Sequence, residues 1–461
     1  MSNQKKYSID MVNGPLAGKI LRFALPFMLA NMIQRLFNAA DVVIVGKFAG
    51  DASQAAVSST TALINLLIDL FVGMGVGVNV VVARALGSGE RSRISGVVHT
   101  TVTLGLIFGL FLVAVGECFA PAMLRLMGSP EELIGLSTLY LRVYFLGMPG
   151  ELVYNFSSAL LRAQGDTKRP MYFLTLSGVI NVVLNVIFVV CFQWDVAGVA
   201  AATILSKYVS AALVLWCLVR ETGVIHLDLK KLRLEWDALK EIVRIGLPSG
   251  VQGCMYDVAN VTVQAAINSM GQIVVAGNGA AASLGTFVNA AANAFGSSAL
   301  TFAGQNLGAG KTERVDRVIR WCLLYAIVVP TVVGLAAYAM GPWLLGIYTD
   351  SPEVIEQGLI RMLMVGSGYG LVGIVSVFSG VLRSMGHSTA TMCITMLGTC
   401  GLRILWINTV FAALGTIQSL YACYSLSWAV TGLMLMVGFL VVRPKFYAKA
   451  LAERPGCAEE V

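Results

Sequence analysis

Long apolar runs separated by short polar segments recur along the whole chain. A helix needs roughly 20 mostly apolar residues to cross a bilayer, and runs of that length occur twelve times. The pattern therefore predicts an all-α membrane protein whose twelve transmembrane helices cover residues 16–40, 53–80, 95–116, 134–160, 170–191, 196–219, 241–268, 274–303, 318–340, 354–380, 390–412 and 417–441.

The two halves of the chain resemble each other at an offset of 221 to 222 residues. Four blocks match in the same order: Ile20–Pro26 with Ile242–Pro248, Ala85–Gly89 with Asn306–Gly310, Ser129–Glu131 with Ser351–Glu353, and Leu161–Arg162 with Leu382–Arg383. The repeat predicts two pseudo-symmetric six-helix bundles related by an axis along the membrane normal. We expect an N-terminal lobe over 1–222, a cytoplasmic linker over 223–240, and a C-terminal lobe with a short cytoplasmic tail over 241–461.

Composition and charge placement agree with a membrane location. Hydrophobic residues make up 57% of the chain and charged residues 12%, whereas soluble domains carry about 25% charged residues. Most Lys and Arg fall in alternate inter-helix segments, which predicts that these segments and both termini are cytoplasmic. The net charge of +7 is then a feature of topology, and we expect no nucleic-acid partner. The expected location is the inner (plasma) membrane.

Enzymatic and metal-binding functions have little support in the sequence. The nine cysteines show no CxxC spacing, and the three histidines lie far apart, so no metal site is predicted. The string containing Gly73, Gly75 and Gly77 follows no strand and lies in an apolar run, which favours close helix packing over phosphate binding. We expect no enzyme, no catalytic residue and no cofactor beyond a coupling ion.

An ordered set of motifs resembles a known family. The motifs are Leu25-Pro26, Asp41–Gly46, Ala85–Gly89 and Leu161–Pro170, and together they resemble the multidrug and toxic compound extrusion (MATE) transporters. The resemblance covers nearly the whole chain. It implies export of cationic or amphipathic compounds in exchange for protons or sodium ions. We expect the chain to act as a monomer.

Asp41 is the clearest candidate for a functional charge. Ionisable residues inside a membrane are costly and mark functional sites by default. Burial in an apolar medium favours the protonated carboxyl, so Asp41 is suited to taking up and releasing a proton. The alternative is an acid at a helix end that faces the outer water, because Lys47 and Gly50 follow closely.

The MATE resemblance implies a polar ion-coupling cluster around Asp41. The matching positions are Asn181, Asn185 and Thr203; without the resemblance, polar contacts between helices would explain them as well. Many members carry a second aspartate where this chain has Asn185, and a single carboxylate favours protons over sodium. The repeat places Val263 opposite Asp41, so we expect the cluster in the N-terminal half alone.

Four other charges are candidates for the cavity. Arg35 and Asp257 occupy equivalent positions of the repeat, and they are expected either to pair in one state of the cycle or to contact substrate separately. Asp69 is a candidate second proton carrier or partner for Arg35, and Glu151 a candidate cavity residue or membrane-surface residue. Candidate apolar lining residues are Phe37, Tyr154, Met255, Tyr256, Phe287 and Phe295, although most such residues in membrane helices face lipid or neighbouring helices.

Three functional hypotheses follow. The first is a proton- or sodium-coupled antiporter that exports organic cations or amphipathic drugs by alternating access. The second is a flippase for a lipid-linked oligosaccharide or another lipid, which predicts a strongly cationic cavity. The third is a receptor or channel, for which Asp41 would be dispensable.

Overall fold

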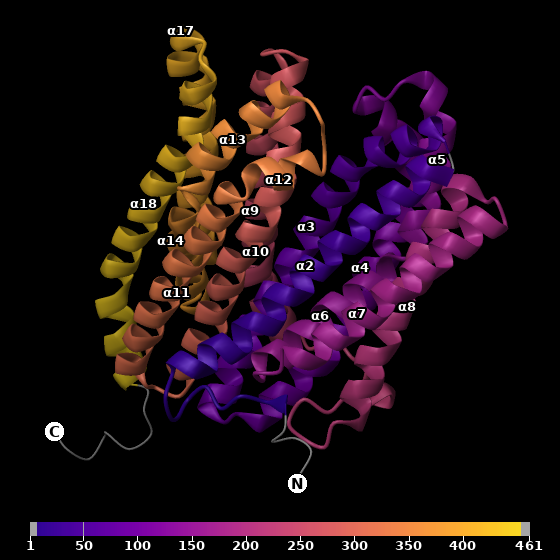
Figure 1. Ribbon diagram of the computed structural model, residues 1–461. Coiled ribbons are helices and arrows are strands. Elements are labelled where there is room, and N and C mark those ends of the chain that lie inside the picture. The colour runs from indigo at the N-terminus through magenta and orange to yellow at the C-terminus, as the bar shows by residue number, and fades with distance from the viewer. Residues whose placement is uncertain (1–6, 49, 453–461) are drawn as a thin grey trace. The chain divides into compact units, whose positions relative to one another are not determined.

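The computed structural model describes residues 7–48 and 50–452. These residues are almost entirely helical, and no strand occurs among them (Figure 1). The extreme ends of the two predicted lobes, 1–6 and 453–461, lie outside the described residues. The all-α fold class is confirmed.

Each predicted span overlaps one helix or a run of consecutive helices. In chain order the elements are α2 (Ala17–Phe48), α3 (Asp51–Ser88), α4 (Arg91–Leu126), α5 (Glu131–Leu146), α6 (Met148–Ala163), α7 (Lys168–Asn185), η1 (Val186–Cys191), α8 (Asp195–Arg220), η2 (Leu229–Lys231), α9 (Trp236–Asn268), α10 (Gln272–Gly308), α11 (Thr312–Ala339), α12 (Gly341–Gly346), α13 (Pro352–Gly366), α14 (Tyr369–Ser384), α15 (Ser388–Thr395), η3 (Met396–Gly401), α16 (Leu402–Trp406), η4 (Ile407–Phe411), α17 (Ala412–Leu414) and α18 (Ile417–Ala452).

The count of twelve spans is met only in part. In the described residues, nine helices are long and apolar enough to cross a membrane, or ten when α13 and α14, bent by 41°, are taken as one broken span. The other two predicted spans are helical but fall outside this set. One is divided into α5 and α6, of 16 residues each, and the other, α9, is interrupted by polar residues such as Gln252 and Asp257.

The chain packs as two compact units. Unit 1 comprises 1–9, 29–85 and 90–250, and unit 2 comprises 10–28, 86–89 and 251–461. In unit 1, α4 packs against α6, α6 packs against α8, and α5 contacts both α4 and α8. The same contacts recur in unit 2, where α11 packs against α14, α14 packs against α18, and α13 contacts both α11 and α18. The predicted pseudo-symmetry is therefore visible in helix packing, while the predicted lobe boundaries at 222 and 241 stay predictions.

The glycine-rich string of α3 serves close helix packing, as predicted. A Cβ atom on Gly73 would lie 2.1 Å from the backbone nitrogen of Gly250, and one on Gly77 would lie 2.4 Å from the carbonyl oxygen of Ile242. Both partners belong to the part of α9 that packs in unit 1. Side chains larger than hydrogen would force these helices apart.

The segment between α8 and α9 is held against α4 by backbone hydrogen bonds. The amide of Asp228 donates to His99 Nε2 at 3.1 Å, and the amide of Glu235 donates to Thr100 Oγ1 at 2.9 Å. The Lys230 amide donates to the Asp228 carboxylate and lowers its pKa. His99 thus has a structural role in unit 1.

Candidate functional site: a carboxyl–amide cluster and a guanidinium–aromatic cluster

Unit 1 brings together the four residues that the sequence assigned to ion coupling. Asn185 Nδ2 donates to Asp41 Oδ1 at 2.5 Å and to Asn181 Oδ1 at 3.3 Å. Asn181 Nδ2 donates in turn to Thr203 Oγ1 at 3.4 Å. Asn181 and Asn185 are buried, whereas Asp41 and Thr203 are half-buried. The result is a hydrogen-bonded chain that runs from α2 through α7 to α8.

The backbone of α7 changes its winding at this cluster. Asn181 and Asn185 lie one turn apart, so both side chains emerge on one face. The α-helix ends at Asn185 and continues as the π-helical segment η1. Such segments occur frequently at functional sites because they interrupt the regular i to i−4 ladder.

One atom of the cluster is left without a hydrogen bond. Asn185 is 0% exposed. Among the described residues, its Oδ1 atom is buried and has no hydrogen-bond partner. Buried polar atoms normally find a partner. Asn185 therefore has an unoccupied hydrogen-bond acceptor beside a carboxyl group that can carry a proton.

A lysine beside the cluster was not foreseen. Lys207 of α8 lies 3.7 Å from Glu151 Oε2 in an ion pair whose side chains are only 11% and 15% exposed. Its ammonium also lies 3.7 Å from the centre of the Tyr144 ring, and it interacts electrostatically with Asp41. Glu151, predicted to be either a cavity residue or a surface residue, is thus a partly buried counter-ion.

The remaining predicted residues of unit 1 have different surroundings. Phe37 packs against Gly178, where an added Cβ would lie 1.9 Å from its ring. Tyr154 is buried and donates its hydroxyl to the Pro170 carbonyl at 2.8 Å. Arg35 is exposed on α2, and Asp69 is half-buried on α3. Their predicted contacts with substrate or protons stay predictions.

Unit 2 contains a buried guanidinium at a position that the repeat relates to Asn181. Arg403 of α16 is 2% exposed; its Nη1 donates to Asn260 Oδ1 at 2.9 Å, and its Nε donates to Ser427 Oγ at 3.1 Å. The Tyr424 ring lies 4.5 Å from its Cζ atom. Neutral oxygens and an aromatic face therefore surround this charge.

A second guanidinium also lies near the Tyr424 ring. Arg361 of α13 donates to Asn278 Oδ1 at 2.6 Å and lies 5.6 Å from the Tyr424 ring centre. Among the described residues of unit 2, no carboxylate comes within 4 Å of either guanidinium. Unit 2 therefore holds two positive charges whose partners there are neutral.

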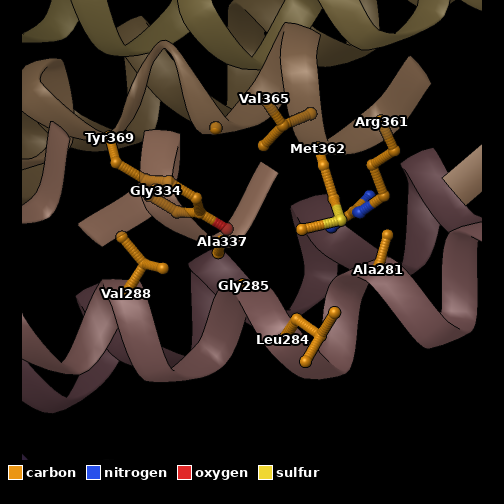
Figure 2. A pocket seen from close by; sticks show the side chains of 11 residues that line it. Ala281, Leu284, Gly285, Val288, Gly334, Ala337, Arg361, Met362, Val365 and Tyr369 are labelled. Atoms are coloured by element: carbon orange, nitrogen blue, oxygen red, sulfur yellow. The ribbon is translucent and has the colours of Figure 1, made fainter. Parts of the chain in front are cut away.

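Arg361 lines a small, partly open cavity between α10, α11, α13 and α14. Figure 2 shows its guanidinium beside Met362 at one end of the cavity and Tyr369 at the other, with the tyrosine hydroxyl directed toward Gly285. The remaining walls are apolar and small: Ala281, Leu284, Val288, Gly334, Ala337, Val365 and Gly366.

The other predicted residues of unit 2 lie outside the wall of this cavity. Phe295 is buried and packs on the Tyr325 ring at 5.7 Å between ring centres. Met255 and Tyr256 are half-buried on α9, and Phe287 is half-buried on α10. Asp257 belongs to unit 2, whereas Arg35 belongs to unit 1, so their proposed pairing stays a prediction.

The sequence contained a signal for the unforeseen residues. Lys207, Arg361 and Arg403 all fall inside predicted spans, where any ionisable residue is a functional candidate. Nothing in the sequence, however, indicated which other residues they contact.

Comparison with known proteins identifies the class. The MatE family model matches residues 26–187 and 248–407. The chain is 27% identical over 371 residues to the probable multidrug resistance protein YoeA of Bacillus subtilis, covering 79% of this chain and 80% of the relative. It is 25% identical to the FAD transporter of Shewanella oneidensis, covering 88% and 89%.

The solved structures agree on the fold. An outward-facing multidrug resistance transporter of the MATE family superposes with a TM-score of 0.87 at 22% identity, covering 95% of this chain and 97% of that one. The family match and the curated relatives define the chain as a polytopic membrane transporter. The chain belongs to the MatE family.

Proposed function

We propose that the protein exports organic cations or other amphipathic compounds by alternating access, in exchange for protons. The curated relatives are named for multidrug resistance and for FAD transport, which supports small-molecule cargo. We expect it to work as a monomer in the inner (plasma) membrane, with both termini in the cytoplasm, as the distribution of basic residues predicts.

The contact between Asp41 and Asn185 supports proton coupling most directly. A deprotonated Asp41 accepts a hydrogen bond from Asn185 Nδ2 at 2.5 Å. A protonated Asp41 becomes a donor, and Asn185 Oδ1, which has no partner among the described residues, can accept that bond once the amide rotates. An asparagine can therefore satisfy both protonation states, because its amide carries both a donor and an acceptor.

Lys207 argues against sodium as the coupling ion. Its ammonium interacts electrostatically with Asp41 and would repel a sodium ion bound at that carboxylate. The cluster also offers a single carboxylate, so little negative charge offsets the cost of dehydrating a cation. Protonation requires only that one carboxyl group.

Efflux from proteoliposomes tests the proposal. The full chain is reconstituted, loaded with a fluorescent organic cation, and given either a proton or a sodium gradient. We expect proton-driven efflux in the wild type and none in Asp41→Asn, because the amide cannot exchange a proton.

Asp237→Asn is the matched control, since Asp237 is an exposed acid at the start of α9 and the chemical change is the same. It should transport like the wild type. Efflux driven by sodium alone would overturn the ion assignment, and equal proton-driven efflux in wild type and Asp41→Asn would overturn coupling at Asp41.

One observation favours the flippase alternative. A flippase for lipid-linked sugars predicts a cationic cavity, and unit 2 contains Arg361 and Arg403 without carboxylate partners there. Movement of a fluorescent anionic lipid between leaflets, with no efflux of any tested cation, would establish this second function instead.

A further inference from the structure

The cavity beside Arg361 combines one cation with an otherwise apolar wall. A guanidinium inside a membrane segment is costly, so it is normally paired. In unit 2 its hydrogen-bond partner is Asn278 Oδ1, a neutral oxygen at 2.6 Å. This contact and the neighbouring rings of Tyr421 and Tyr424 bring no formal negative charge to the guanidinium.

The second guanidinium adds to the positive field at this place. Arg403 lies 4.5 Å and Arg361 lies 5.6 Å from the centre of the same Tyr424 ring. Both cations therefore add to the positive potential near this ring. An anion that entered the cavity would be attracted by this potential and could accept hydrogen bonds from Arg361.

The cavity is small and partly open, and its wall places a cation beside apolar side chains, which suits the charged group of an amphipathic molecule. Gly285 leaves room for the Tyr369 hydroxyl, because a Cβ atom there would lie 2.1 Å from the hydroxyl oxygen. The wall between Arg361 and Tyr369 consists of small and apolar side chains. Ligand sites commonly combine such walls with a few polar groups that fix orientation.

We propose that this cavity binds the carboxylate or phosphate group of an amphipathic anion, with Arg361 as the anchoring residue. Guanidinium groups match the planar, bidentate geometry of carboxylates and phosphates. The inference deepens the proposed transport function by assigning a charge class to part of its cargo. The anion can be a free solute or a lipid headgroup, which share this chemistry.

Equilibrium binding without any ion gradient tests the inference separately from transport. The full chain is placed in nanodiscs of phosphatidylcholine and titrated with 2-naphthoate and 2-naphthylmethylammonium, which share a ring system and differ in charge. We expect the wild type to prefer naphthoate. Arg361→Gln should weaken naphthoate binding about tenfold, the loss typical of one charge-assisted contact.

Two further variants serve as a second test of the cavity and as a control for the loss of an arginine. Gly285→Ala adds a methyl group that would lie 2.1 Å from the Tyr369 hydroxyl, so it displaces this side chain in the cavity without changing the charge; it should weaken naphthoate binding even where Arg361→Gln does not fold. Arg142→Gln is the matched control, because Arg142 is a half-exposed arginine of α5 that pairs with Glu117; it should bind like the wild type. Equal naphthoate affinity in wild type and Arg361→Gln, or a preference for the ammonium probe, would overturn the proposal.

Lipid composition distinguishes the two sources of the anion. When phosphatidylglycerol replaces part of the phosphatidylcholine, a headgroup site predicts weaker naphthoate binding by competition, and this loss should disappear in Arg361→Gln. A solute site predicts unchanged affinity. A proton-coupled exporter that fails the naphthoate test would keep its transport function and lose only this anion site.

Discussion

The clusters of unit 1 and unit 2 occupy equivalent places in the repeat yet have opposite chemistry. The offset relates Asn181 to Arg403 (403 − 181 = 222) and Thr203 to Tyr424 (424 − 203 = 221). In unit 1 these positions form a chain of amide and hydroxyl groups that ends on Asp41. In unit 2 they form a guanidinium stacked on an aromatic ring.

The scaffold around both clusters is nevertheless similar. The helix that carries Asn181 passes into the π-helical segment η1, and its counterpart passes through η3 and η4. The breaks at Gly147 and Gly368 also correspond (368 − 147 = 221). One helical framework has therefore accepted two different sets of side chains, so the fold alone does not fix the charge of its interior.

The largest expected difference between the clusters concerns the loss of a hydroxyl group. Ser427→Ala would leave the buried Nε–H of Arg403 without its acceptor, which should lower the free energy of unfolding by about 2 kcal/mol. Thr203→Val removes a hydroxyl that accepts only a neutral amide at 3.4 Å and should cost about 0.6 kcal/mol. Thermal unfolding of both variants in one detergent measures the difference, and equal costs would show that the charge of Arg403 is compensated elsewhere.

A second carboxylate in unit 1 would sharpen the assignment of the coupling ion. Asn185→Asp places two carboxyl groups side by side, and such pairs share one proton over a wide pH range. We expect proton-driven efflux at neutral pH to fall about tenfold, or about 1.4 kcal/mol, and sodium to begin to stimulate efflux. Asn268→Asp, at the exposed end of α9, is the control, and an unchanged rate without a sodium response would contradict the expectation.

The smallest expected effect is the coupling between Lys207 and Glu151. Their atoms are 3.7 Å apart, longer than a charge-assisted hydrogen bond, so we expect an interaction energy of about 1 kcal/mol. A double-mutant cycle with Lys207→Met and Glu151→Leu, measured by thermal unfolding, gives this energy. An additive result would mean that Lys207 interacts mainly with Asp41 or Tyr144 instead of Glu151.

The motif pattern alone predicts which residues surround Asp41. The resemblance points to Asn181, Asn185 and Thr203, and these residues form one hydrogen-bonded chain with Asp41. The spacing of the two asparagines already put them on one helix face. The orphaned oxygen of Asn185, by contrast, depends on the rotation of a single amide, which no sequence pattern encodes.

The sequence by itself determined the class and the framework of this protein. Apolar runs of membrane-spanning length and a repeat of 221 to 222 residues are local or periodic features, and hydrophobic patterning fixes helices because lipid leaves the backbone few alternatives. The tertiary structure decided which charges meet. That Glu151 faces Lys207, and that Arg361 and Arg403 share Tyr424, depends on how helices distant in sequence rotate and pack, because side-chain contacts between helices arise only from that packing.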